Sequence, residues 1–150
     1  MKIYVAGKWG NSDEMRAINA IQALLVAHGH TITHDWTRVE GDKVTADTMV
    51  SDARREFRAR CATLDVDGVV AADALVVLMT DCTYPYRGTF TEIGVALGLK
   101  KRILLIAPRE LRIGEGVKPP ALFAATNCFF EHPSIEHVDT VEDVICALNE

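Results

Sequence analysis

The sequence predicts an α/β fold in which a parallel sheet of about five strands is covered by helices on both faces. Short β-branched or aliphatic runs alternate along the chain with segments whose apolar residues recur every three or four positions. Two of those runs, 74–79 and 103–106, are apolar without alternation, as strands are when both faces of a parallel sheet are covered. Helices that connect such strands make right-handed crossovers, so we expect three layers.

The first half of the chain is predicted to hold two strands and two helices. Residues 3–6 form an apolar run ended by a glycine, which is typical of a first buried strand. A helix follows, with Ser12 and Asp13 as candidate N-caps, apolar positions three or four residues apart, and Gly29 where a C-terminal cap is expected. Residues 30–36 alternate weakly and predict a second strand. A long helix is expected from about residue 46 to 68–72, with an apolar stripe along one side: Met49, Ala53, Phe57, Cys61 and Leu64.

The second half is predicted to complete the sheet. The run 74–79 is expected at the sheet centre, followed by a helix over 89–99 and the strand 103–106. A loop, a short strand around 128–130 and a final helix over 140–148 complete the pattern. These elements predict a flavodoxin-like or Rossmann-like three-layer sandwich with a five-stranded parallel sheet.

Length and composition favour one compact domain. The chain has 150 residues, which is the size of a single domain, and it contains no repeat, low-complexity tract or linker. Its residues are 49% hydrophobic and 25% charged, which excludes disordered, collagen-like and coiled-coil classes. We therefore expect a single domain over residues 1–150.

Charge and cysteine content exclude several kinds of partner. The 16 basic and 21 acidic residues give a net charge of -5, which opposes binding of a polynucleotide but leaves a mononucleotide open. No apolar run is long enough for a membrane span or a signal-peptide core. The four cysteines are too widely spaced for a zinc site. We expect a cytoplasmic protein with reduced thiols and without a metal or cofactor.

The candidate site lies at one edge of the predicted sheet, because ligands of such folds bind beyond the carboxyl ends of the strands. Four features converge there: the segment from Tyr4 to Trp9, Asp65 on the long helix, Arg87-Gly88-Thr89, and Glu92. Neither glycine-containing segment has the spacing of a phosphate loop or a dinucleotide fingerprint. An ATPase or a dinucleotide-dependent dehydrogenase is therefore disfavoured.

Each candidate also has a purely structural interpretation. Thr89 and Glu92 have the spacing of a capping box, in which both side chains would satisfy backbone N–H groups. Alternatively, Glu92 is a nucleophile or general base near a helix N-terminus. Asp65 borders the predicted apolar stripe, so it either points toward the site or is a solvated helix carboxylate. The segment 34–36, His-Asp-Trp, either binds a base or ends a strand.

Over residues 1–107 the chain resembles the nucleoside 2-deoxyribosyltransferase family and the related 2′-deoxynucleoside 5′-monophosphate N-glycosidases. The resemblance rests on three segments in order: Ile3-Tyr4-Val5-Ala6-Gly7 with Trp9, Leu64-Asp65-Val66-Asp67-Gly68 before Ala72-Asp73-Ala74-Leu75-Val76-Val77, and Gly88-Thr89-Phe90-Thr91-Glu92-Ile93-Gly94. The third segment is similar to the family's glycine-threonine-x-x-glutamate-x-glycine helix start.

The resemblance implies a function and roles for individual residues. Glu92 would attack the anomeric carbon of a deoxyribose and form a glycosyl-enzyme, while Asp65 would orient the base and relay a proton to it. Tyr4 would hold Glu92 in position, and Gly7 and Trp9 would line the nucleoside pocket. The partners would be a nucleoside or nucleotide and a free base, and the protein would form a homodimer or a higher homo-oligomer.

The resemblance leaves the finer activity open. Attack by a second base makes a transferase, and attack by water makes a hydrolase. Tyr86 and Arg87 stand where the transferases often have an acidic residue; Arg87 suits a 5′-phosphate, together with Gly88 and Thr89 at the helix start. Asn127 is a candidate to complete a neighbouring subunit's site. A non-catalytic nucleotide sensor on the same fold, or an N-glycosidase for another ribosylated metabolite, are the alternatives.

Overall fold

The computed structural model describes residues 1–10, 13–38, 52–81, 84–107 and 128–149. Five strands form one sheet in the order β2-β1-β3-β4-β5, and each neighbouring pair is parallel. The strands are β1 (Lys2–Ala6), β2 (Thr31–Ile32), β3 (Ala74–Leu78), β4 (Arg102–Ile106) and β5 (Ile135–His137). This is the flavodoxin order, so the predicted fold class is confirmed.

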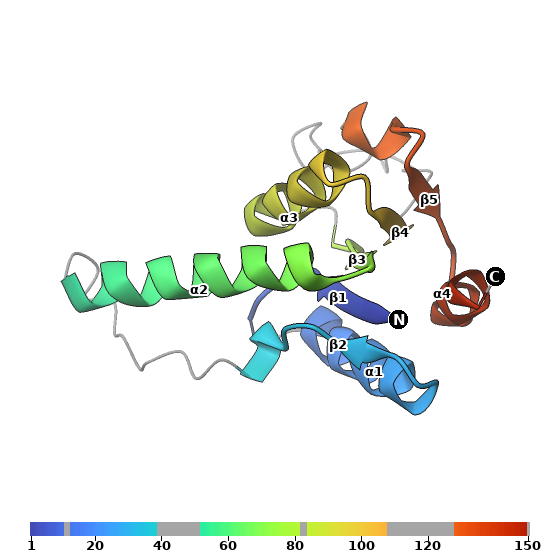
Figure 1. The fold of residues 1–150 in the computed structure, drawn as a ribbon, viewed down its shortest axis with the longest axis horizontal. Coiled ribbons are helices and arrows are strands. Elements are labelled where there is room, and N and C mark those ends of the chain that lie inside the picture. The colour runs from blue at the N-terminus through green and yellow to red at the C-terminus, as the bar shows by residue number, and fades with distance from the viewer. Residues whose placement is uncertain (11–12, 39–51, 82–83, 108–127, 150) are drawn as a thin grey trace, which may run out of the picture.

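Four helices cover the two faces of the sheet. They are α1 (Asp13–Ala27), α2 (Asp52–Ala71), α3 (Arg87–Gly98) and α4 (Val141–Leu148). In Figure 1, α2 and α3 lie on one side of the strands and α1 and α4 on the other. The three predicted layers are therefore present. The final helix begins with a capping box, in which Thr140 is the N-cap and Asp143 is the acidic residue three positions later.

The core is built on the strands that were predicted from continuous apolar runs. Every residue of β3 is buried, and so are the last four residues of both β1 and β4. Helices on both faces exclude water from both sides of these strands, which is why their sequences do not alternate.

Two predicted strands are wrong in extent or position. The strand expected over 30–36 ends at Ile32, because the chain then bends into a short 3-10 helix in which Trp36 donates its indole N–H to Val5 O at 2.7 Å. The strand expected around 128–130 is a 3-10 helix, in which Phe130 is buried and stacks on Phe90. The fifth strand instead follows at Ile135–His137.

The long helix is present, but its apolar stripe is not a core face. Leu64 is 39% exposed, and Phe57 and Cys61 are only partly buried. Among the α2 residues whose burial the structure describes, only Gly68 and Val69 are buried. The N-terminal part of α2 extends beyond the strands (Figure 1), so it has no sheet to pack against. The predicted start at residue 46, Met49 and the side chain of Ala53 lie outside what the structure describes.

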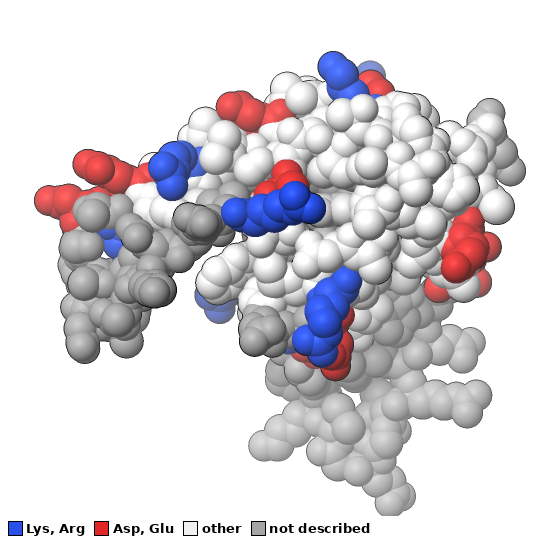
Figure 2. Space-filling view, turned by 90° about the horizontal axis from the view of Figure 1, so that it is seen from below, with Lys and Arg blue, Asp and Glu red and all other residues white. Residues whose placement is uncertain are grey.

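The surface of the described residues shows no large field of one charge on the face drawn in Figure 2, where basic and acidic side chains are interspersed. Within the described ranges, no helix has the length and apolarity that crossing a membrane requires.

Candidate active site

A cavity of about 460 Å³ opens at the carboxyl ends of β1 and β3. These two strands are neighbours whose connections run in opposite directions along the sheet, so the cavity lies at the switch point where ligands bind in this fold. Its volume is in the range of small-molecule sites. Six of the residues singled out from the sequence line it: Gly7, Trp9, Asp65, Gly88, Thr89 and Glu92.

Tyr4 joins two carboxylates that line this cavity, Glu92 and Asp65, but is not itself a lining residue. It lies on β1 and is fully buried; its hydroxyl is 2.6 Å from Glu92 Oε1 and 3.3 Å from Asp65 Oδ1. A phenol has one proton to donate, and the shorter distance assigns that proton to Glu92. The family resemblance predicted these three residues as a group, although Tyr4 is 61 positions from Asp65 and 88 positions from Glu92 in the sequence.

Burial changes the acidity of all three groups. It raises the pKa of Glu92 from 4.5 to about 7; the charge of Asp65 adds to this rise, and the hydrogen bond from Tyr4 opposes it. Burial also raises the pKa of Asp65, against the opposing effects of His34 and Tyr4. The pKa of Tyr4 is raised first by burial and then by the Glu92 charge, so Tyr4 stays a donor. Perturbed, coupled carboxyls in a cavity are typical of catalytic sites.

Two residues next to the trio fix its geometry. His34 Nε2 is 3.5 Å from Asp65 Oδ1, and Trp36 of the same His-Asp-Trp segment lines the cavity. Gly68 leaves room for both partners, because a Cβ there would come within 2.7 Å of His34 Cβ and 2.9 Å of the Tyr4 ring. No real Cβ tolerates such contacts, so α2 can approach β1 this closely only with glycine at position 68.

Comparisons with known proteins identify the family. The family model for nucleoside 2-deoxyribosyltransferase matches residues 3–132. The chain belongs to this family. No curated protein gives a significant match. Among solved structures, a 2-deoxyribosyltransferase from Bacillus psychrosaccharolyticus is 22% identical, with a TM-score of 0.64; the match covers 97% of this chain and 90% of that one. The Clostridium botulinum CMP N-glycosidase BcmB is 14% identical, with a TM-score of 0.56 and 100% coverage of both chains.

The interpretation of Thr89 and Glu92 as a capping box is wrong. Helix α3 begins two residues earlier, at Arg87, and its N-cap is Tyr86 in the left-handed conformation, with no side-chain cap. Thr89 instead donates to Gly7 O at 3.1 Å, which ties α3 to the loop after β1. Glu92 is therefore turned toward Tyr4 rather than bound to the helix N-terminus.

Not every residue that was predicted to form the site lines the cavity. Arg87 is exposed and is not among the lining residues, although it was expected to bind substrate. Trp9 lines the cavity with 65% of its surface exposed, so it stands at the mouth. Asn127 lies outside the described residues. Within those residues, no group of three His, Cys, Asp or Glu side chains could hold a metal ion.

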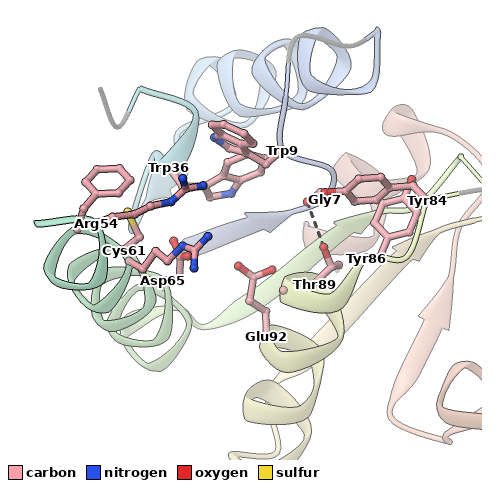
Figure 3. A pocket seen from close by; sticks show the side chains of 13 residues that line it. Gly7, Trp9, Trp36, Arg54, Cys61, Asp65, Tyr84, Tyr86, Thr89 and Glu92 are labelled. Carbon is pink, nitrogen blue, oxygen red and sulfur yellow. Dashed lines mark hydrogen bonds between the residues drawn. The ribbon is translucent and has the colours of Figure 1, made fainter. Parts of the chain in front are cut away.

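Several lining residues were missed in the sequence. Figure 3 shows them on two sides of Glu92: Arg54 and Cys61 beside Asp65 on α2, and Tyr84 and Tyr86 across from them. Phe57 and Arg58 complete this set, whereas Trp36 belongs to the segment that the sequence already offered as a base-binding candidate. A signal was present, because Arg54, Arg58, Cys61 and Asp65 follow at intervals of four, three and four, which places them on one face of a helix.

A buried glutamate holds the loops around the cavity. Glu14, on α1, is 7% exposed and accepts hydrogen bonds from Lys8 N at 3.1 Å, from Thr80 Oγ1 at 3.1 Å and from the Tyr86 hydroxyl. Tyr86 Oη also accepts from Asp81 N at 2.9 Å. One carboxylate thus connects the loop after β1, the end of β3 and the start of α3. No sequence pattern predicts this role, because position 14 falls in the first turn of a helix, where acidic residues are common.

Replacing Glu14 by Ala should destabilise the protein by roughly 2–4 kcal/mol, because a buried hydroxyl and a buried backbone N–H lose a charged acceptor. Chemical denaturation of the two proteins measures this difference. Replacing Glu56, which is exposed on α2, by Ala is the control and should change stability by less than about 0.5 kcal/mol. Equal stability of the Glu14 and Glu56 variants would show that the network does not hold the loops.

Proposed function

We propose that this protein cleaves the N-glycosidic bond of a 2′-deoxynucleoside and transfers the deoxyribose to another base. The observation that carries the proposal is the Tyr4 hydroxyl that joins Glu92 and Asp65, two carboxylates that line a cavity of suitable size. Cleavage passes through an oxocarbenium-like transition state, which needs a carboxylate at the anomeric carbon and an acid at the leaving group.

In the first step a Glu92 carboxylate oxygen bonds to the anomeric carbon. The bond from that carbon to the base nitrogen breaks, and its electron pair leaves with the base. Asp65 supplies the proton that the base needs. The raised pKa of Asp65 supports this role, because a carboxyl must be protonated to act as an acid. Tyr4 keeps its proton and orients the nucleophile by donating to it.

In the second step a new base attacks the glycosyl-enzyme. The carboxylate of Glu92 leaves, and Asp65 takes the proton that the incoming base loses. Both groups then have their starting charge, so no cofactor is consumed. Attack by water instead would make the enzyme a hydrolase.

A 5′-monophosphate substrate is the second candidate function. The fold that the chain shares with a CMP N-glycosidase favours it, as do the cationic side chains at the cavity, Arg54 and Arg58. Arg87 gives it less support, because this side chain is outside the lining.

Three further predictions stay untested: a single domain, a homo-oligomer whose neighbouring subunit completes the site, and a cytoplasmic location.

A base-exchange assay tests the proposal. The purified protein is incubated with 2′-deoxyinosine and free adenine, and in parallel with 2′-deoxynucleoside 5′-monophosphates alone, and the products are separated by chromatography. We expect 2′-deoxyadenosine in the first reaction. Free base without a new nucleoside would identify a hydrolase. Neither exchange nor base release, with the protein folded by circular dichroism, would contradict the proposal and favour a non-catalytic nucleotide sensor.

A further inference from the structure

We propose that Arg54 and Arg58 read the outer edge of the leaving base and select bases that present oxygen acceptors there, such as 6-oxopurines, over bases that present an amino group. This inference rests on the proposed function, because it takes Asp65 as the group next to the leaving base. It concerns residues that neither the sequence resemblance nor the transfer mechanism requires.

The first step of the argument is the position of the arginines on α2. They share one face of the helix with Asp65, at four-, three- and four-residue intervals through Cys61. With a rise of 1.5 Å per residue, Arg58 is about 10 Å from Asp65 along the axis, and Arg54 is one turn further. The arginine side chains cover part of this distance and a base bound against Asp65 covers the rest, because all three residues line the same cavity. The guanidinium groups can thus contact a base that Asp65 protonates.

The second step is the side of the cavity on which the base lies. In Figure 3, Arg54 and Asp65 lie on the α2 side of Glu92, whereas Tyr84, Tyr86 and Thr89 lie on the other side. If Glu92 attacks the anomeric carbon and Asp65 protonates the leaving base, the base occupies the α2 side. The sugar then faces the tyrosines.

The third step is the chemistry of that side. Trp9, Trp36 and Phe57 line it, and aromatic faces suit a planar base. The Arg60 guanidinium lies 5.6 Å from the centre of the Phe57 ring and helps to fix it. The cationic groups that line the cavity are the guanidinium groups of Arg54 and Arg58, which donate hydrogen bonds and accept none.

Guanidinium donors discriminate between base edges. Arginine pairs with O6 and N7 of a 6-oxopurine through two hydrogen bonds, whereas the 6-amino group of adenine is itself a donor. Arg54 is partly buried, so a mismatched amino group there would meet a positive charge away from bulk water. Such a pair discriminates by about tenfold or more.

The test compares 2′-deoxyinosine with 2′-deoxyadenosine, which differ only at this edge. We expect the wild-type kcat/KM for base release to be about tenfold or more higher for 2′-deoxyinosine. In the double variant Arg54→Met, Arg58→Met, that ratio should fall close to one, chiefly because 2′-deoxyinosine becomes a poorer substrate. Arg55→Met is the matched control, because Arg55 is exposed on the same helix and outside the cavity lining; it should leave the ratio unchanged.

A binding measurement separates failure of this inference from failure of the proposed function. Calorimetric titration with free hypoxanthine and free adenine needs no turnover; hypoxanthine should bind about tenfold or more tightly, and only the double variant should lose the difference. A preference for hypoxanthine without base release would contradict the proposed function alone. Equal wild-type binding, an unchanged ratio in the double variant, or a double-variant defect confined to 5′-monophosphates would overturn the inference.

Discussion

The Glu92→Gln enzyme is expected to release base at least about 10⁴-fold more slowly than the wild type, a loss of the size seen when the nucleophile of an enzyme is removed. The amide keeps the shape of the side chain and can still accept the Tyr4 hydrogen bond through its oxygen. What it lacks is the negative charge that forms the bond to the anomeric carbon. Single-turnover assays with 2′-deoxyinosine measure the effect on the chemical step.

The same substitution should stabilise the protein at neutral and alkaline pH. The pKa of Glu92 is about 7 in the folded protein, against an ordinary value of 4.5, so folding penalises its charged form. The penalty is absent below pH 4.5, where folded and unfolded states both bind the proton. It grows between pH 4.5 and 7 and is complete above pH 7. At about 1.4 kcal/mol per pKa unit, it amounts to roughly 3 kcal/mol.

Thermal denaturation between pH 4 and 8 measures this stability difference. Glu56→Gln, at an exposed position on α2, is the control and should change neither activity nor the pH dependence of stability. A Glu92→Gln enzyme that still releases base would remove the nucleophile assignment. If the variant is inactive but no more stable than the wild type at pH 8, burial does not penalise the charged form of Glu92.

The sheet and the edge at which Tyr4 and Glu92 meet were predictable from the sequence for the same physical reason. Strands such as β3 are buried on both faces, so they must be apolar throughout, and that pattern is readable without any alignment. Once the order of strands and helices is known, the carboxyl ends of the strands define one edge. Tyr4 precedes the end of β1 and Glu92 follows β3 by one loop, so both converge on that edge.

The rest depended on tertiary contacts that a local pattern does not show. The spacing of Phe57 and Cys61 is the same whether the face they share packs on a sheet or lines a cavity, so α2 was mistaken for a core helix. The left-handed backbone of Tyr86, with φ of 43°, moves the start of α3 to Arg87 and removes the expected capping box. Non-glycine residues adopt this conformation only where the surroundings impose it, and here the Tyr86 hydroxyl is bound to Glu14.

Replacing Tyr4 by Phe should shift the pH profile of kcat/KM to higher pH, in addition to lowering the rate. The Tyr4 hydroxyl donates to Glu92 and holds its pKa down, and it has the same effect on Asp65. Without it both pKa values rise. Glu92 must be ionised to attack and Asp65 must be protonated to act as an acid, so both limbs of a bell-shaped profile move upward.

The size of the Tyr4→Phe effect follows from the hydrogen bond that is lost. A hydrogen bond to a charged group contributes about 1.5–3 kcal/mol, so the acid limb should move up by about one to two pH units. Activity at pH 6 should fall by roughly tenfold to a hundredfold, and activity at pH 9 should fall much less. Profiles of kcat/KM between pH 5 and 10 measure both limbs. A profile lowered equally at every pH would mean that Tyr4 positions Glu92 without setting its acidity, and an unchanged profile would remove Tyr4 from the mechanism.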